Sequence, residues 1–166
     1  MKNRFLFILF LFISISLNST ASENRFDVSN IELVDGGKII IANDGKYISK
    51  DRKLEIEANK FIYNKEENLI TIFDGETKNN SEKLKINFNK STYNEIDLIF
   101  SAEGNIIIND YMNNLLIISE KIIFDRKKNF LLIEGNVDVR EITKDYRYQS
   151  EKITVDRKNN IIKSET

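Results

Sequence analysis

Apolar segments of about ten residues alternate with short polar clusters along most of the chain. Ile, Phe, Tyr, Val and Thr fill these segments, and their apolar positions alternate, which favours strands over helices with a period of 3.6. Polar links of only a few residues join consecutive strands in antiparallel fashion. The pattern therefore predicts an all-β, antiparallel chain. The clusters that separate the strands are residues 64–68, 79–82, 94–97, 110–114, 125–129, 141–145 and 156–160.

A repeat of about 30 residues underlies this pattern. Its markers are four lysines with spacings of 30, 31 and 31 residues: Lys60, Lys90, Lys121 and Lys152. An aromatic or branched residue follows three positions after each marker: Tyr63, Tyr93, Phe124 and Val155. A fixed period of this kind indicates a fold built from repeated units.

The alternation changes phase at every marker lysine. In the first copy, Ile56 and Ala58 alternate before Lys60. Phe61 and Tyr63 alternate after it, shifted by one position. A β-bulge or a bend produces such a slip, and the slip recurs in all four copies. The alternative is that both faces of the sheet are partly covered.

Three glycines interrupt the strands between the markers. Gly75, Gly104 and Gly135 lie 14 or 15 residues after a marker lysine, with apolar residues on both sides. A glycine within a strand marks a bend or a close backbone approach. We therefore expect bent strands stacked into a folded-over sheet with an apolar inner groove. If its own side chains fill the groove, the fold is an ordinary sandwich core, and the pattern leaves both arrangements open.

The pattern is less regular ahead of the repeats. Residues 26–34 predict a lead-in or edge strand, and residues 39–41 predict a short β-branched strand. Asn43, Asp44 and Gly45 then give a turn signal of the hairpin type. We therefore expect the second strand to end at this turn.

Residues 1–21 have the features of an export signal. Lys2 and Arg4 precede an apolar run at 5–17, and the small residues Ser19 and Ala21 suit a signal-peptidase site. The run is shorter than the roughly 20 residues that span a bilayer, which disfavours an uncleaved anchor. We expect a cleaved signal peptide at 1–21, followed by a single domain at 22–166.

The composition excludes several kinds of chemistry. The chain has no Cys and no His, hence no disulfide, no zinc site of the His/Cys type, no thiol nucleophile and no histidine base. Asp125 and Asp156 occupy equivalent turn positions, which favours turn formation over paired catalytic carboxylates. The basic run at 126–128 is interpreted as a solvated turn rather than a phosphate site. We expect no enzymatic activity, no cofactor and no bound metal.

The charge balance argues against nucleic-acid binding. The formal net charge is −1, and removing the two bases of residues 1–21 leaves 23 Lys and Arg against 26 Asp and Glu. A slightly acidic chain does not suit a phosphate backbone.

The repeat unit resembles the OstA-like (organic solvent tolerance) domain family. The resemblance rests on residues 58–64 with Leu69, and on residues 119–125 leading to 134–137, and it covers roughly residues 38–166. Members of this family are lipopolysaccharide transport proteins: the soluble periplasmic bridge LptA, the N-terminal domain of the outer-membrane translocon LptD, and the bitopic LptC. The resemblance implies a β-jellyroll of the β-taco kind, whose groove holds lipid acyl chains while the sugar projects into solvent.

The resemblance also implies a ligand, partners and a location. The ligand is lipopolysaccharide, the location is the periplasm, and the partners are other OstA-like domains joined by edge-strand pairing. Such partners are further copies of this chain or proteins of the LptC and LptD type. The groove residues implied by the resemblance and the repeat are Ile56, Ala58, Phe61, Tyr63, Phe88, Tyr93, Phe100, Ile106, Ile117, Ile122, Phe124, Leu131, Ile133 and Val137.

Two departures from the family bear on these expectations. LptD proteins commonly carry cysteines that tie this domain to their barrel, and this chain has none. The fourth copy stops at Thr166, where the repeat expects a glycine, so that the chain is either a short LptA type or a fragment of an outer-membrane-associated LptD type. The rival fold is an exported parallel β-solenoid, acting as an adhesin or as a glycan-binding or glycan-active protein, because coils of about 30 residues also suit a β-helix.

Overall fold

The computed structural model describes residues 24–49, 54–79, 83–144, 146–159 and 161–165. The signal peptide predicted at 1–21 lies outside these ranges, as does Thr166. Within the described ranges there are ten strands and one short 3₁₀ turn, η1 (Asp35–Gly37). The strands are β1 (Arg25–Val34), β2 (Ile39–Ile48), β3 (Glu55–Asn64), β4 (Leu69–Asn79), β5 (Leu84–Asn94), β6 (Ile99–Asp110), β7 (Leu115–Asp125), β8 (Phe130–Glu141), β9 (Tyr146–Asp156) and β10 (Ile161–Glu165).

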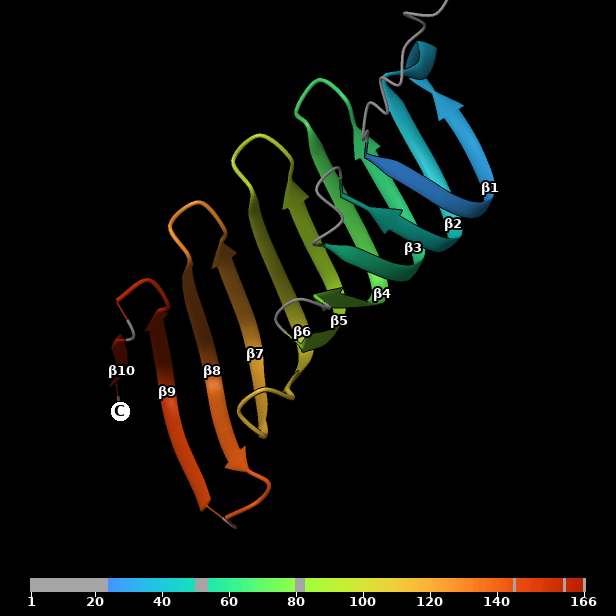
Figure 1. The fold of residues 1–166 in the computed structure, drawn as a ribbon. Helices are drawn as coiled ribbons and strands as arrows, with labels where there is room; N and C mark the ends of the chain where they lie inside the picture. The colour runs from blue at the N-terminus through green and yellow to red at the C-terminus, as the bar shows by residue number, and fades with distance from the viewer. Residues whose placement is uncertain (1–23, 50–53, 80–82, 145, 160, 166) are drawn as a thin grey trace, which may run out of the picture.

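All ten strands lie in one antiparallel sheet, in chain order from β1 to β10 (Figure 1). The pairing of β7 with β8 is antiparallel across the turn at residues 126–129, with Asp125 opposite Phe130. This geometry excludes the parallel β-solenoid and confirms the all-β, folded-over sheet. β1 and β10 form the two edges of the sheet, which is not closed into a barrel. Among the described residues, no helix is long and apolar enough to cross a membrane.

A crease crosses every strand from β1 to β9 and divides the sheet into two leaves. Leaf A comprises residues 25–28, 45–48, 55–58, 75–79, 84–88, 106–110, 115–119, 137–141 and 146–150. Leaf B comprises residues 29–34, 39–43, 60–64, 69–73, 90–94, 99–103, 121–125, 130–134, 152–156 and 161–165. The bend predicted from the phase slip is confirmed, because two consecutive exposed residues separate the buried positions there, as Asn59 and Lys60 do in β3.

Left-handed backbone produces the crease in the even-numbered strands. Gly104 and Gly135 have φ of 78° and 79°, and the asparagine that follows each is also left-handed. The strand register shifts at both places, which is the signature of a β-bulge. In β2 and β4 the left-handed residue is an aspartate instead, Asp44 or Asp74, each with φ of 50°. Gly, Asn and Asp are the residue types that tolerate this conformation.

The turn predicted at Asn43, Asp44 and Gly45 is wrong. These residues lie inside β2, which continues to Ile48, and Asp44 is the left-handed residue at the crease of that strand. An aspartate followed by glycine tolerates left-handed backbone both in a hairpin and within a bent strand, so the dipeptide alone does not distinguish them. Gly45 pairs with Ala58 and Val28 on the two neighbouring strands, and the register is the same on both sides of Asp44.

Polar side chains fix the turns, as the sequence indicates for Asp125 and Asp156. The Asp125 carboxylate accepts a hydrogen bond from the backbone N–H of Lys128, and Asp156 accepts one from Asn159. Asn64, Asn94 and Asp110 hold their turns in the same way. The first polar residue of each of these turns therefore ends a strand by replacing ladder hydrogen bonds with local ones.

Close packing at the crease makes Gly75 sensitive to substitution. A Cβ atom there would lie 2.7 Å from the Ala58 Cβ atom and 2.8 Å from the Glu57 carbonyl oxygen. β4 lies between two paired strands and has no room to shift. We expect Gly75→Ala to lower the free energy of unfolding by about 2–3 kcal/mol, the upper range for overpacking. Urea denaturation measures this loss.

Gly36→Ala is the matched control, because nothing lies within 4 Å of a Cβ atom at Gly36. Because Gly36 has a φ of 63°, the substitution places an alanine in left-handed backbone, which lowers the free energy of unfolding by about 1 kcal/mol. Equal effects of the two substitutions would show that the approach of β3 to β4 at the crease is not tight.

Candidate functional site

The inner face of the folded sheet carries rows of apolar side chains that run across the strands. Each row has one member per strand, because paired residues in neighbouring strands point to the same face. The leaf A row, near the free rim of that leaf, is Phe26, Tyr47, Ile56, Thr77, Ile86, Ile108, Ile117, Val139 and Tyr148. The leaf B row, near the opposite rim, is Leu33, Ile40, Tyr63, Ile70, Tyr93, Phe100, Phe124, Leu131, Val155 and Ile162.

A third row lies in leaf B next to the crease and has smaller side chains. Its members are Ile31, Ala42, Phe61, Ile72, Ser91, Ala102, Ile122, Ile133, Ile153 and Ser164. The Ser91 hydroxyl is buried and has no hydrogen-bond partner among the described residues. Small members such as Ala102 let the two leaves approach each other beside the crease.

The structure places all fourteen groove residues expected from the sequence on the inner face. Ten of them are buried: Ile56, Ala58, Phe61, Phe88, Tyr93, Phe100, Ile106, Ile122, Ile133 and Val137. The other four are partly buried against the same core: Tyr63, Ile117, Phe124 and Leu131. Their contact with a lipid stays a prediction.

In the middle of the sheet, side chains from the two leaves fill the groove. The ring centroids of Phe88 in leaf A and Phe100 in leaf B are 5.7 Å apart. Those of Tyr47 in leaf A and Tyr93 in leaf B are 6.0 Å apart. Of the two arrangements that the sequence leaves open, the filled core describes these central strands.

The inner face is less covered toward both edges of the sheet. In the leaf B row, Tyr93 and Phe100 are each 2% exposed, whereas Leu33 at the β1 edge is 64% exposed and Ile162 at the β10 edge is 71% exposed. Phe124, Leu131 and Val155, which precede Ile162 in this row, are only partly buried. Both ends of the groove therefore present apolar surface, the N-terminal end at Leu33 and the C-terminal end from Phe124 to Ile162.

A polar clasp joins the leaves in the N-terminal half. The Tyr47 and Tyr63 hydroxyls each donate a 2.7 Å hydrogen bond to the Glu95 carboxylate, and Asn24 donates a third. Burial, followed by the hydrogen bond to Glu95, raises the pKa of Tyr63 to about 12, and the same causes raise the pKa of Tyr47 further above its ordinary value. Both phenols are therefore neutral donors to a carboxylate that bridges β2 of leaf A and β3 of leaf B.

In the later copies of the repeat, arginine occupies the turn position that Glu95 has in the second copy. Glu95, Arg126 and Arg157 are the first residues of three leaf B turns, and each reaches back to the leaf B row of the preceding copy. Arg126 donates a 3.1 Å hydrogen bond to the Tyr93 hydroxyl. The Arg157 guanidinium carbon lies 5.9 Å from the centroid of the Phe124 ring.

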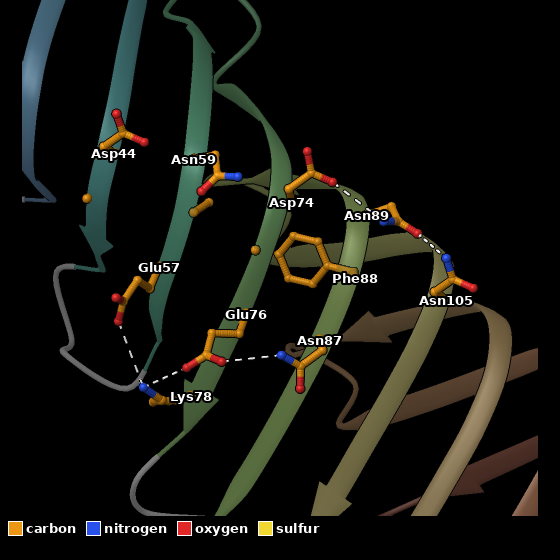
Figure 2. A pocket seen from close by; sticks show the side chains of 13 residues that line it. Asp44, Glu57, Asn59, Asp74, Glu76, Lys78, Asn87, Phe88, Asn89 and Asn105 are labelled. Atoms are coloured by element: carbon orange, nitrogen blue, oxygen red, sulfur yellow. Dashed lines mark hydrogen bonds and ion pairs between the residues drawn. The ribbon is translucent and has the colours of Figure 1, made fainter.

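A largely polar hollow of about 780 Å³ lies at the crease, with Phe88 among its lining residues (Figure 2). Crease residues of neighbouring strands form one side of it, where Asn105 donates to Asn89 and Asn89 donates to Asp74 (Figure 2). Charged residues form the other side, and its centre is Glu76, whose carboxylate lies 2.7 Å from the Lys78 amine and 2.6 Å from the Lys85 amine. Within the described residues, no group of three or more Asp and Glu has the arrangement of a metal site.

The sequence expectations missed one copy of the inner face. Tyr47 is 0% exposed and belongs to the clasp, but the turn assigned to residues 43–45 places it outside the repeat. The signal that identifies it is the spacing of the crease glycines: Gly45, Gly75, Gly104 and Gly135 follow one another at 30, 29 and 31 residues. Tyr47 lies two positions after Gly45, as Thr77, which is buried in the same leaf A row, does after Gly75.

Comparisons with known proteins support the fold through structure rather than sequence. The sequence matches no protein-family model and no curated protein. A solved structure with the same fold is LptH from Pseudomonas aeruginosa, described as the LptA-homologous periplasmic component of the conserved lipopolysaccharide transport device. The match has a TM-score of 0.59 at 10% sequence identity and covers 79% of this chain and 96% of LptH. The chain therefore has the open, folded-over β-jellyroll architecture of LptH.

The clasp predicts a specific loss of stability. In Glu95→Gln, the two tyrosine hydroxyls lose a charged acceptor, and hydrogen bonds to charged groups contribute about 1.5–3 kcal/mol each. We expect the free energy of unfolding to fall by about 2 kcal/mol, measured by urea denaturation. The matched control is Glu66→Gln on the neighbouring turn, whose exposed ion pair with Lys38 contributes less than about 1 kcal/mol. Equal losses in both variants would show that the clasp does not hold the leaves together.

The cluster at Glu76 predicts acid sensitivity. The hydrogen bonds from Lys78 and Lys85 lower the pKa of Glu76 from 4.5 to about 2. Because the folded-state pKa is depressed, this carboxylate stabilises the fold above pH 4.5, and its contribution disappears as the pH falls to about 2. We expect unfolding measured across this interval to show a smaller loss of stability in Glu76→Gln than in the wild type. A loss of the same size in both proteins would assign the acid sensitivity to other carboxylates, such as Asp138, whose pKa Arg147 and Arg140 also lower to about 2.

Proposed function

We propose that this chain is a non-enzymatic module of the OstA-like family that carries lipopolysaccharide through the periplasm toward the outer membrane. The observation that supports it is the open, two-leaved antiparallel sheet with apolar rows on its inner face, in the fold that LptH also has. An apolar surface enclosed between leaves whose backbones are joined at the crease suits long acyl chains. Among the described residues, Glu95 reaches these rows, and its carboxylate is held by tyrosine hydroxyls.

Acyl chains would bind by replacing contacts between the two leaves. The central strands are filled by their own side chains, so that binding there requires the leaves to separate. Each methylene that leaves water gains about 0.8 kcal/mol, and a chain of about ten methylenes gains about 8 kcal/mol on the same scale. The partly covered face around Phe124 and Leu131 offers the first contact without that separation.

We also infer a location and a mode of assembly. A cleaved signal peptide at 1–21 would deliver residues 22–166 to the periplasm. Among the described residues, β1 and β10 are the edge strands and no strand pairs with their outer sides, which suits strand addition. Each edge also exposes apolar side chains, Ile31 and Leu33 in β1 and Ile161 and Ile162 in β10. Further copies of this chain, or domains of the LptC and LptD type, are the partners that such edges suit.

Site-specific photo-crosslinking tests the proposal. A photoreactive amino acid at Phe124, in the leaf B row, is expected to form a covalent adduct with purified lipopolysaccharide on irradiation. The same amino acid at Ile123, which precedes it on the opposite face of β7, is the matched control and is expected to give no adduct. Adducts are detected as lipopolysaccharide-positive bands of lower mobility on denaturing gels.

The reverse pattern would refute the proposal. Adducts from Ile123, or from the exposed turn residue Lys128, with none from Phe124, would mean that the inner face does not hold the lipid. Phe100, which is 2% exposed, extends the test to the filled core, because an adduct there requires that the leaves separate.

A further inference from the structure

The loops along the rim of leaf A change from charged to apolar along the sheet. The first two loops of this rim, residues 49–54 and 80–83, contain six charged residues between them. The third, residues 111–114, contains no charged residue, and the fourth, residues 142–145, contains one base and one acid. The rim therefore loses its charge at the strands of the C-terminal half, β6 to β9.

Large apolar side chains take the place of those charges and are exposed. Tyr111, Met112 and Ile142 in the third and fourth loops, and Tyr146 at the start of β9, are between 59% and 68% exposed. The two loops are neighbours at one end of the sheet (Figure 1), and the Ile142 N–H donates a 2.9 Å hydrogen bond to the Asn114 carbonyl. We call these four side chains the apolar rim. Because the loops are bonded to each other, they present one patch rather than two independent tips.

The backbone of the third loop makes its hydrogen bonds within the protein. The Asp110 carboxylate accepts hydrogen bonds from the N–H groups of Met112 and Asn113. The Tyr111 N–H donates to the Lys83 carbonyl. A backbone N–H that leaves water without a partner is costly, so these bonds lower the cost of moving the loop into surroundings that contain little water.

The charged groups next to the apolar rim have partners of opposite sign. Lys144 lies 2.9 Å from Glu141. Arg140 and Arg147 both donate to the Asp138 carboxylate. A contact made at this rim therefore depends on apolar side chains rather than on attraction between bases and anionic groups.

The apolar rim is continuous with the inner face of the groove. Tyr146 lies two positions before Tyr148 of the leaf A row, and therefore on the same face of the sheet. Leu115, which follows the third loop, lies two positions before Ile117 of that row. Ile117, Val139 and Tyr148 are only partly buried. One apolar surface thus extends from the groove to the tips of the loops.

The size and chemistry of the apolar rim favour a lipid bilayer over a folded protein as its partner. A stable protein interface covers about 800 Å² on each side with about 20–30 residues, whereas this patch has four side chains on projecting loops. A bilayer surface accepts a small apolar patch of this kind. Tyrosine suits it in particular, because its ring enters the apolar layer while its hydroxyl stays among the headgroups.

We propose that the apolar rim of Tyr111, Met112, Ile142 and Tyr146 inserts into the surface of a lipid bilayer. This contact goes beyond the proposed function, because it concerns a surface outside the groove. With the rim inserted, the leaf A side of the groove faces the lipid. An acyl chain then passes between the bilayer and the groove along a continuous apolar surface.

Tryptophan fluorescence tests the contact, because the chain has no tryptophan of its own. In Met112→Trp, emission is expected to shift to shorter wavelength when phosphatidylcholine vesicles are added. It is also expected to be quenched when the phosphatidylcholine is brominated on its acyl chains. The readout is local, so it reports the rim whether or not residues 1–21 also bind the vesicle.

The matched control is Ile96→Trp on the rim of leaf B. Ile96 is a turn residue with a similar exposure of 61%, but it lies between Glu95 and Asp97, whose charges oppose insertion. Its emission is expected to stay unchanged. Equal quenching at positions 112 and 96 overturns the inference, because insertion is then not specific to the apolar rim.

Two further measurements test the apolar character of the contact. Adding Ile142→Ser and Tyr146→Ser to Met112→Trp is expected to weaken vesicle binding about tenfold or more. All three positions are exposed, and unfolding midpoints establish that the variants are folded before binding is compared. Quenching at position 112 is expected to be the same in high salt, and the same with phosphatidylglycerol in the vesicles. Quenching that requires phosphatidylglycerol and disappears in salt assigns an electrostatic contact and overturns the inference.

The outcomes separate the apolar rim from the groove. Lipopolysaccharide adducts at Phe124 without quenching at position 112 leave the proposed function standing and overturn the bilayer contact. Quenching at position 112 without adducts at Phe124 refutes the proposed function and supports the bilayer contact as a separate property. A shift at position 112 that appears without vesicles and grows with protein concentration means that a second copy covers the rim, which also overturns the inference.

Discussion

The architecture depends on one backbone constraint, the left-handed residue or bulge that lies at the crease of the even-numbered strands from β2 to β8. A straight strand alternates its side chains between two faces, so a long strand folded back on itself would turn its apolar side outward in one arm. The slip of one residue at the crease corrects this, and both arms then present large apolar side chains to the same interior, as Phe88 and Tyr93 do in β5. Gly104 and Gly135 with their asparagines, and Asp44 and Asp74, supply that conformation.

The filled centre and the exposed edges are compatible with the proposed function, in which the groove accepts and releases an acyl chain. Replacing contacts between apolar side chains by contacts with acyl chains exchanges one apolar environment for another, so the net change in free energy is small compared with the burial itself. An acyl chain has no polar groups, so it cannot replace the polar contacts between the leaves that break when the leaves separate. The hydrogen bonds of Tyr47 and Tyr63 to Glu95 therefore oppose separation more specifically than the apolar core does.

Local chemistry explains how much of the fold the sequence predicts. Strand segments, turn positions and the phase slip depend on alternation and on residues such as Asp125, which act within a few positions of themselves. The role of Asp44 and Gly45 was not predictable in the same way, because neighbouring strands decide whether this dipeptide forms a turn or a bend within a strand. The inner placement of the fourteen groove residues was expected from the family resemblance together with the repeat. The clasp was not predictable from the sequence, since Glu95 contacts Tyr47 and Tyr63, which are 48 and 32 positions away. These residues come together only when one leaf folds over the other.

Backbone hydrogen bonds between successive turns give the sheet unequal stiffness in two directions. The N–H of Glu95 donates to the Asn68 carbonyl, that of Arg126 to Leu98, and that of Arg157 to Asn129, along the rim of leaf B. On the rim of leaf A, Tyr111 donates to Lys83 and Ile142 donates to Asn114. In each leaf, these bonds join neighbouring turns at the rim, in addition to the ladder hydrogen bonds between the strands. The leaf therefore resists sliding of adjacent strands past one another. Bending about the crease breaks none of these backbone bonds, so the clasp and the apolar contacts between the leaves are what fix the angle between them.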